Sequence, residues 1–335
     1  MHRTKHIVLT AWVGLATLLI SLAPVFTPRA IAATPAAPVN NVGQALEIAP
    51  PVLNLSANPG QTITAQIFLR DVSPGPLIVT GTTNDFVAAG EDGTPKVILN
   101  DDTSNPYSMK SWVNPPASLQ LVSKEIKTMN ITINVPASAA PGGHYGIIRF
   151  TATAPSLSGQ GVSISASLGA LILMTVNGNV KEQLSVKSFT VSHNNRTGKL
   201  FESGPLNFTT RLSNTGNVHE EPVGQIVIKD MFGKRFASTN VNLPPKNVLP
   251  QSIRKFESPL DKSVIGNKRM FGRYTASLTV TYGKDKQTAT SSVTYWVIPL
   301  KTVGIIIAIL IIGFFGIRYG LRRYNRYIIK QSGRR

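Results

Sequence analysis

The stretch APGGHYGIIRF, Ala140–Phe150, decides between two kinds of local structure. Its adjacent glycines could cradle a phosphate, or they could form a turn between strands. A phosphate-binding loop needs a helix directly after its glycines, because the helix N–H groups and dipole face the anion. The following residues instead alternate between two faces, with Tyr145, Ile147 and Arg149 on one and Gly146, Ile148 and Phe150 on the other. The stretch therefore predicts a turn at 141–143 and then a β-strand.

Short apolar runs separated by turn residues continue on both sides of this stretch. TITAQIFLRDV, which begins at Thr62, alternates apolar and polar residues, and no segment from 51 to 295 shows a sustained helical period. Asn214–Asn217 and Asp230–Gly233 have the chemistry of tight turns. The pattern predicts an all-β fold of two tandem immunoglobulin-like antiparallel β-sandwiches, residues 51–180 and 181–295.

Composition narrows the chemistry and supports the domain boundary. The 335 residues include no cysteine, which excludes disulfides, thiolate metal sites, a cysteine nucleophile and a lipid-modified N-terminal cysteine. The net charge of +18 is spread unevenly. Residues 33–180 hold 6 basic and 8 acidic side chains, whereas residues 181–317 hold 18 basic and 8 acidic ones. The second predicted domain is therefore the basic one.

The N-terminus has the features of a secretory signal. Arg3 and Lys5 precede an apolar run, and Ala30 and Ala32 have the A-x-A spacing that signal peptidase accepts. Residues 1–32 are predicted to form a signal helix, and residues 33–50 a spacer before the first domain. An N-terminal anchor that is not cleaved remains the alternative.

The C-terminus has the features of a membrane anchor. Residues 296–317 are predicted to form one transmembrane helix, because at about 1.5 Å per residue they cross a hydrocarbon layer of ~30 Å. Trp296 lies at one predicted interface, and Arg318, Arg322 and Arg323 begin a basic tail, 318–335, at the other. The positive-inside rule predicts a single-pass protein of the cell membrane with a cytoplasmic tail and an extracellular N-terminal region.

The basic tail has two further interpretations. It could bind nucleic acid, or it could recruit a cytoplasmic partner as an amphipathic helix. A stop-transfer anchor that contacts anionic lipid headgroups is favoured over both.

Several segments resemble the WxL-interacting proteins of Gram-positive cell surfaces. They are Tyr107, Trp112, the run LQLVSKEIKTMNITINVPASAAPGGHYGIIRF with the strand GALILMTV, and in the second half LPQSIRKFESPL and FGRYTASLTV. The resemblance implies a signal peptide, two β-sandwiches, one transmembrane helix and a short basic tail. It also implies peptidoglycan binding by the first domain, host ligands for the second, and partner proteins that carry the WxL motif. No motif of that family defines a binding residue in this sequence, and SNTGNVHEEPVGQIVIKDMFGK resembles a more general bacterial immunoglobulin-like pattern.

The residues that could carry catalysis form no recognised motif. His144, His193 and His219 are far apart in the sequence and lack the H-E-x-x-H spacing of a zinc site. Ser252–Lys255 matches S-x-x-K, but it lies in a predicted strand, where residues three apart face opposite sides. The sequence therefore predicts that the protein is not an enzyme and uses no cofactor.

A group of acids leaves a calcium site open. Glu91, Asp92, Asp101 and Asp102 flank one short predicted strand, and a hairpin could bring them together around the ion. They lack the spacing of a dedicated calcium loop. A solvated loop is the favoured interpretation, and no metal site is predicted.

Two groups of residues are candidate ligand contacts. Tyr107 and Trp112 could stack on a sugar ring, although aromatic residues serve more often in core packing. The basic candidates of the second domain are Lys229, Lys234, Arg235, Arg254, Lys255, Lys268 and Arg269, with Lys246, Lys262 and Arg273 in the same domain. They could face anionic wall polymer, membrane headgroups or an acidic partner, and part of the charge could provide solubility. Nucleic acid is a poor match for an extracellular domain without a recognition element.

These features predict a membrane-anchored binding or adhesion protein of the bacterial cell surface. Its sandwiches would engage cell-wall polymer or a surface protein, and exposed sheet edges would also permit β-strand addition. A structural stalk or assembly scaffold without its own ligand remains the alternative. A cell-wall hydrolase would require two carboxylates or a histidine-centred site in one cleft.

Overall fold

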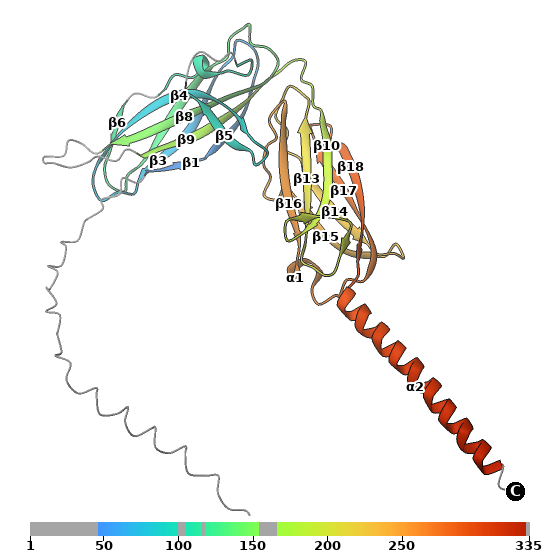
Figure 1. The fold of residues 1–335 in the computed structure, drawn as a ribbon. Helices are drawn as coiled ribbons and strands as arrows, with labels where there is room; N and C mark the ends of the chain where they lie inside the picture. The colour runs from blue at the N-terminus through green and yellow to red at the C-terminus, as the bar shows by residue number, and fades with distance from the viewer. Residues whose placement is uncertain (1–45, 100–104, 116–117, 154–165, 333–335) are drawn as a thin grey trace, which may run out of the picture. The chain divides into compact units, whose positions relative to one another are not determined.

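The chain folds into two β-sandwiches and a long C-terminal helix (Figure 1). The computed structural model describes residues 46–99, 105–115, 118–153 and 166–332. The predicted signal segment, 1–32, and most of the predicted spacer lie outside these residues. The prediction of an all-β fold with two sandwiches and one C-terminal apolar helix is confirmed.

The first sandwich contains a three-stranded and a six-stranded sheet. The first sheet has the order β1-β3-β7, with the bounds β1 Leu46–Ala49, β3 Thr62–Asp71 and β7 Ile126–Asn134. The second has the order β2-β9-β8-β4-β5, and β6 pairs with β4. Its bounds are β2 Val52–Ala57, β9 Ala166–Val176, β8 Gly142–Thr153, β4 Leu77–Ala89, β5 Thr94–Ile98 and β6 Leu119–Leu121. A short 3-10 helix, η1, spans Lys110–Trp112.

The second sandwich contains a four-stranded and a five-stranded sheet. The first has the order β11-β10-β13-β16, with the bounds β11 Arg196–Thr197, β10 Leu184–His193, β13 Leu206–Asn214 and β16 Ser252–Leu260. The second has the order β12-β18-β17-β14-β15. Its bounds are β12 Leu200–Phe201, β18 Gln287–Val297, β17 Gly272–Tyr282, β14 Val223–Lys229 and β15 Arg235–Val241. A one-turn helix, α1 (Lys262–Ile265), follows β16, and α2 spans Leu300–Ser332.

Alternating side chains supply the core of each sandwich. Ile67 of β3 and Ile148 and Phe150 of β8 are fully buried in the first core. Phe208 of β13 and Tyr295 of β18 are fully buried in the second. Each large apolar side chain that leaves water in this way stabilises the fold by about 2 kcal/mol. The period-two pattern in the sequence therefore identifies the residues that hold the sheets together.

The structure corrects three details of the prediction. β2 runs parallel to β9 and β12 parallel to β18, so the sheets are not wholly antiparallel. The segment predicted as a spacer, 33–50, contains β1, which pairs with β3. The predicted transmembrane start at Trp296 lies within β18, because Tyr295 and Val297 point into the second core and continue the alternation past residue 295.

Candidate functional site at the junction of the sandwiches

The strand that contains the opening stretch is buried on both of its faces. Ile148 and Phe150 of β8, which the alternation places on one face of the strand, point into the first core. Tyr145 and Ile147 point to the outer face, where they form a separate apolar cluster with Phe86, Leu173 and other residues. Leu249, which belongs to the second sandwich, packs against this cluster. The outer face of the larger sheet is therefore where the two sandwiches meet.

The paired glycines permit this close approach. Gly142 has a φ of 123°, a conformation that L side chains rarely adopt, and a Cβ there would lie 2.7 Å from the carbonyl oxygen of Asn217. The N–H of Gly143 donates to that same carbonyl oxygen at 2.7 Å. Both glycines already belong to β8, so the predicted turn ends at Pro141. The two glycines therefore contact the second sandwich. The residues after them continue as strand β8 and do not form a helix.

A buried polar group lies beside this contact. The hydroxyl of Tyr145 and Nδ1 of His219 are 3.4 Å apart, and the two rings meet edge to face. Burial lowers the pKa of His219 to about 4 and raises that of the Tyr145 hydroxyl. Burial, with repulsion from Glu182, raises the pKa of Glu220 to about 7. At neutral pH the junction therefore contains an uncharged imidazole next to a carboxyl that holds its proton part of the time.

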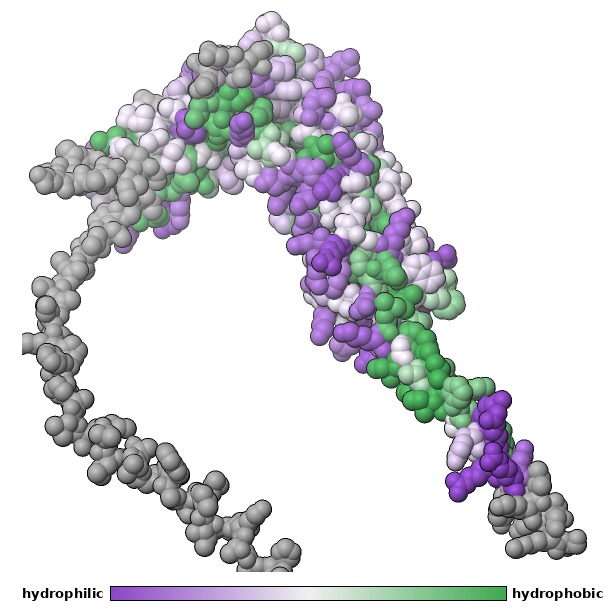
Figure 2. All heavy atoms as spheres, in the orientation of Figure 1, coloured by the Kyte–Doolittle hydropathy of each residue, from purple (hydrophilic) through white to green (hydrophobic). Residues whose placement is uncertain are grey.

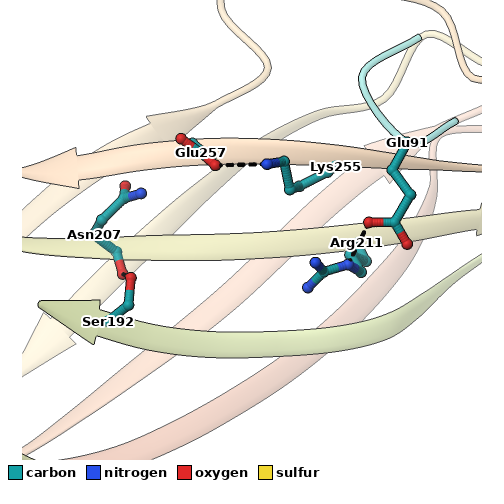
Figure 3. A network of polar contacts seen from close by, with 6 residues as sticks. All are labelled: Glu91, Ser192, Asn207, Arg211, Lys255 and Glu257. Atoms are coloured by element: carbon teal, nitrogen blue, oxygen red, sulfur yellow. Dashed lines mark hydrogen bonds and ion pairs between the residues drawn. The ribbon is translucent and has the colours of Figure 1, made fainter. Parts of the chain in front are cut away.

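A second contact joins the β4–β5 turn to the four-stranded sheet of the second sandwich (Figure 3). Glu91 accepts a hydrogen bond from Nε of Arg211 on β13 at 2.6 Å, and its main-chain carbonyl accepts one from the N–H of Lys255 at 2.6 Å. The ammonium of Lys255 pairs with Glu257 at 2.9 Å, which holds the pKa of that carboxyl below its usual range. The guanidinium of Arg254 packs against Gly93 in the same turn. Charged groups of β13 and β16 therefore serve to hold the first sandwich.

Between these contacts is a pocket of about 380 Å³, within the range of small-ligand sites. Its apolar wall from the first sandwich includes Phe86, Leu171 and Leu173, and Ala88 of β4 lies beside them. The second sandwich contributes the segment 245–249 and Arg254. The pocket is therefore mostly apolar, and its charged lining residues are Lys246, Arg254 and the acid Glu221. It is named the junction pocket below.

Tyr107 and Trp112 have different positions in the structure. Tyr107 is partly exposed, and it lines a second hollow of about 790 Å³ that shares Phe86, Ala88, Leu249 and Ser252 with the junction pocket. Trp112 is 8% exposed and packs in the first core, with its ring centroid 4.4 Å from that of His144. The stacking role considered for Trp112 is therefore corrected: its ring is core, because η1 turns it inward.

The predicted basic residues fall into two separate groups. Arg254 and Lys255 of β16 lie at the junction, where Arg254 donates to the carbonyl of Asn247 at 2.6 Å. Lys229, Lys234, Arg235, Lys268 and Arg269 lie near the ends of β14, β15 and β17 and are exposed. Of the basic residues named from the sequence, Lys246, Arg254 and Lys255 therefore lie at the junction, and the exposed group lies apart from it.

The described residues do not bring the candidate catalytic groups together. His144 faces Trp112 on the core side of β8, His219 faces Tyr145 on the other side, and His193 bonds to Pro205 at the end of β10. The hydroxyl of Ser252 donates to the carbonyl of Leu249, while Lys255 pairs with Glu257.

The acids considered for calcium are divided in the same way. Glu91 is engaged by Arg211, and Asp92 accepts hydrogen bonds from Thr94 at 2.7 and 3.1 Å. Asp101 and Asp102 lie outside the described residues. No group of three possible metal ligands occurs among the residues that the structure describes.

α2 is long and apolar enough to cross a membrane. The candidate span, Leu300–Arg326, has 27 residues, and its apolar part is not buried by the rest of the chain that the structure describes. Figure 2 shows an apolar surface along the first part of the helix and polar residues near its end, where Arg318, Arg322 and Arg323 lie. Trp296, predicted at the membrane interface, is a 45% exposed residue of β18, four residues before the start of the helix at Leu300.

Several junction residues were not predicted from the sequence. Asn217, His219 and Leu249 contact β8 or its neighbours across more than 70 positions of sequence. The one usable signal was that β8 is apolar on both faces although antiparallel sandwich strands usually alternate. When a strand of a two-layer sandwich is apolar on its outer face as well, that pattern indicates that another domain covers the outer face.

No protein-family model matches the sequence, and no curated protein matches it. Solved structures with similarity to the chain are β-sandwich proteins. One is described as a chaperone–tip adhesin complex for CFA/I fimbriae biogenesis, with 13% identity over 74% of this chain and 98% of that chain and a TM-score of 0.37. Another is the class 5 fimbriae chaperone CfaA, with 13% identity over 76% and 100% of the chains and a TM-score of 0.34. A third is a PapD-like domain of human CEP192, with 13% identity over 45% and 98% and a TM-score of 0.28.

Proposed function

We propose that the protein is a membrane-anchored extracellular binding protein whose junction pocket engages a surface protein. The observation that carries the proposal is the junction pocket itself. Its apolar wall suits an apolar side chain of a protein partner, and the guanidinium of Arg254 suits an acidic or carbonyl group beside it. A glycan site would instead present an exposed aromatic platform, whereas Trp112 is buried and Tyr107 is only partly exposed.

The broader features support binding at the cell surface. α2 supplies a membrane anchor, and the positive-inside rule places its basic end in the cytoplasm and the sandwiches outside. The resemblance to WxL-interacting proteins makes a partner with the WxL motif the first to test. Peptidoglycan binding by the first sandwich stays a prediction from that resemblance, and binding rather than catalysis is the proposed activity.

The test is retention of the full chain, in detergent, on isolated cell walls. Walls are used untreated, stripped of protein by protease, or stripped of anionic polymer, each across a salt series. We expect saturable retention that protease treatment of the walls abolishes. Retention that survives protease but not polymer removal would instead assign binding to wall polymer, and no saturable retention would indicate a stalk without a ligand.

A matched pair of variants locates the site. Ala88→Arg places a long side chain into the junction pocket from β4, where Ala88 is partly exposed. Thr82→Arg adds the same side chain at an exposed position of the same strand, away from the pocket lining. Retention should fall for Ala88→Arg and stay unchanged for Thr82→Arg. Equal retention for the two variants would contradict the junction pocket as the binding site.

A further inference from the structure

The end of the second sandwich next to α2 carries exposed side chains that the junction does not use. Lys229 of β14 pairs with Thr275 near the start of β17, and Arg273 pairs with Trp296 near the end of β18, so these strand ends share one end of the sheet. This end, the membrane-end collar, is defined by the apolar Met231, Phe232, Phe271 and Trp296 and the basic Lys229, Lys234, Arg235, Arg269 and Arg273. All of them are exposed.

The apolar part of the collar is held out by a well-bonded turn. Phe232 is 87% exposed and Phe271 is 61% exposed. Oδ1 of Asp230 accepts hydrogen bonds from the N–H groups of Phe232 at 2.9 Å and Lys234 at 3.0 Å, and Gly233 supplies the φ of 79° that the turn requires. The ring of Phe232 therefore projects from a defined turn. Large apolar groups gathered at one exposed end indicate an interaction surface.

The collar is positively charged because its five basic residues outnumber the two acids beside it, Asp230 and Asp261, whose carboxylates bind backbone N–H groups and not the collar cations. Asp230 closes the β14–β15 turn, and Asp261 caps α1 by accepting from the N–H of Ser263 at 2.9 Å. Lys268, next to Arg269, donates from Nζ to the carbonyl of Phe236 and lies over the ring of that residue. The remaining cations surround exposed aromatic rings. This combination of aromatic and basic side chains is typical of a lipid interface.

The chain connection fixes how far this surface can be from a membrane. The N–H of Ile298 donates to the carbonyl of Phe201 at 2.8 Å, so the sandwich extends to that residue, and α2 begins at Leu300. From Val297 to Leu300 the Cα atoms can be separated by at most about 11 Å. The uncharged run between Lys301 and Arg318 has 16 residues and is about 24 Å long, shorter than a hydrocarbon layer of ~30 Å, so the edge of that layer reaches Lys301. The first turn of α2 therefore lies at headgroup level, and the collar is within reach of the headgroups.

We propose that the membrane-end collar docks on anionic lipid headgroups of the membrane that α2 crosses. Phe232 and Phe271 insert at the interface, while Lys234, Arg235 and Arg269 contact the phosphates. Docking limits the angles that the second sandwich can adopt above the membrane and so orients the junction pocket. The inference rests on the proposed anchoring by α2 but not on the identity of the ligand at the junction.

The test uses the full chain in lipid nanodiscs of phosphatidylcholine, with or without phosphatidylglycerol. Because the chain has no cysteine, a single substitution can carry a unique fluorescent label. Met231→Cys labels the collar and leaves Phe232 in place, and Val223→Cys labels the opposite end of β14, where Val223 is also exposed. The readout is quenching of the label by lipids that carry a quencher near the headgroup.

The expected result is strong quenching at position 231 in discs with phosphatidylglycerol, weaker quenching without it, and little at position 223 in either. Adding Phe232→Ser, Lys234→Glu and Arg269→Glu to the labelled chain should abolish the quenching at 231. These three positions are exposed, so a melting curve should show an unchanged fold.

Three outcomes would overturn the docking. Equal, weak quenching at positions 231 and 223 in anionic discs would show that the collar does not touch the membrane. Loss of the quenching at position 231 in anionic discs on addition of soluble polyglycerol phosphate would assign the collar to wall polymer. Failure of the chain to enter discs at all would remove the membrane anchoring together with the docking, whereas a chain that enters discs but is not quenched removes the docking alone.

Discussion

At the scale of single residues, Glu220 places a carboxyl where water cannot fully solvate it. Its side chain is 3% exposed, and Oε1 makes no hydrogen bond within the described part of the chain. The unfolded carboxyl has its ordinary pKa of about 4.5, and the folded one about 7. Between these values the folded state holds more protons, so the free energy of unfolding decreases as the pH rises.

Glu220→Gln should therefore stabilise the protein at high pH. The gain should grow from about pH 4.5 to pH 7 and then stay constant, reaching roughly 1 to 3 kcal/mol. His219 has the opposite slope, because its lowered pKa destabilises the fold as the pH falls from 6.5 toward 4. Melting temperatures of the two chains across this range check the prediction. Parallel curves for the variant and the parent would contradict it.

Buried and exposed aromatic residues should contribute very different amounts to the stability of the second sandwich. Phe208 packs at 5.7 Å from Phe189 and 6.0 Å from Tyr295, measured between ring centroids, and is fully buried. Phe208→Ala should cost about 3 to 5 kcal/mol of unfolding free energy. Phe232→Ala, at an 87% exposed position, is the control and should change it by less than about 0.5 kcal/mol. Denaturant unfolding measures both, and a similar cost for the two would be inconsistent with the second core.

At the scale of elements, the end of β18 decides where the second sandwich stops. Val297 is 1% exposed, and the N–H groups of Trp296 and Ile298 donate to the carbonyls of Lys199 and Phe201. A chain that ends after Tyr295 loses these groups, and a chain that ends after Pro299 keeps them. The shorter chain should be less stable by roughly 3 kcal/mol or more. Chemical denaturation of the two truncated chains is the measurement, and equal stability would show that β18 ends at residue 295.

The sequence predicts strands that alternate between apolar and polar residues better than it predicts short strands or polar edge strands. The alternating run TITAQIFLRDV corresponds to β3, because the buried residues of that strand recur at every second position. β12 was not recognised because a two-residue strand has no period. β15, RFASTNV, was missed because Ser, Thr and Asn hide the apolar face of an edge strand. The apolar residues on both faces of β8 indicate that another domain covers this strand, but the residues of the second sandwich that contact it could not be predicted, because they lie far away in the sequence.

At the scale of the whole molecule, α2 predicts one orientation across the membrane. Arg318, Arg322 and Arg323 lie in the C-terminal half of α2, and the positive-inside rule predicts that they face the cytoplasm. In intact cells, a membrane-impermeant maleimide should label Thr82→Cys, whereas Gln331→Cys should react only after the membrane is permeabilised. Labelling of Gln331→Cys in intact cells would reverse the proposed orientation.

The contact between Glu91 and β16 has a further consequence for how the protein assembles. β16 is an edge strand, and Pro259 within it already lacks one N–H group. The N–H group of Lys255 donates to the carbonyl of Glu91 and is no longer free to pair with another strand. The first sandwich therefore covers part of an edge that could otherwise pair with a second chain. Synthesis proceeds from the N-terminus, so this blocking turn exists before β16 is made. The order of the two domains along the gene thus protects the newly made chain from edge-to-edge aggregation.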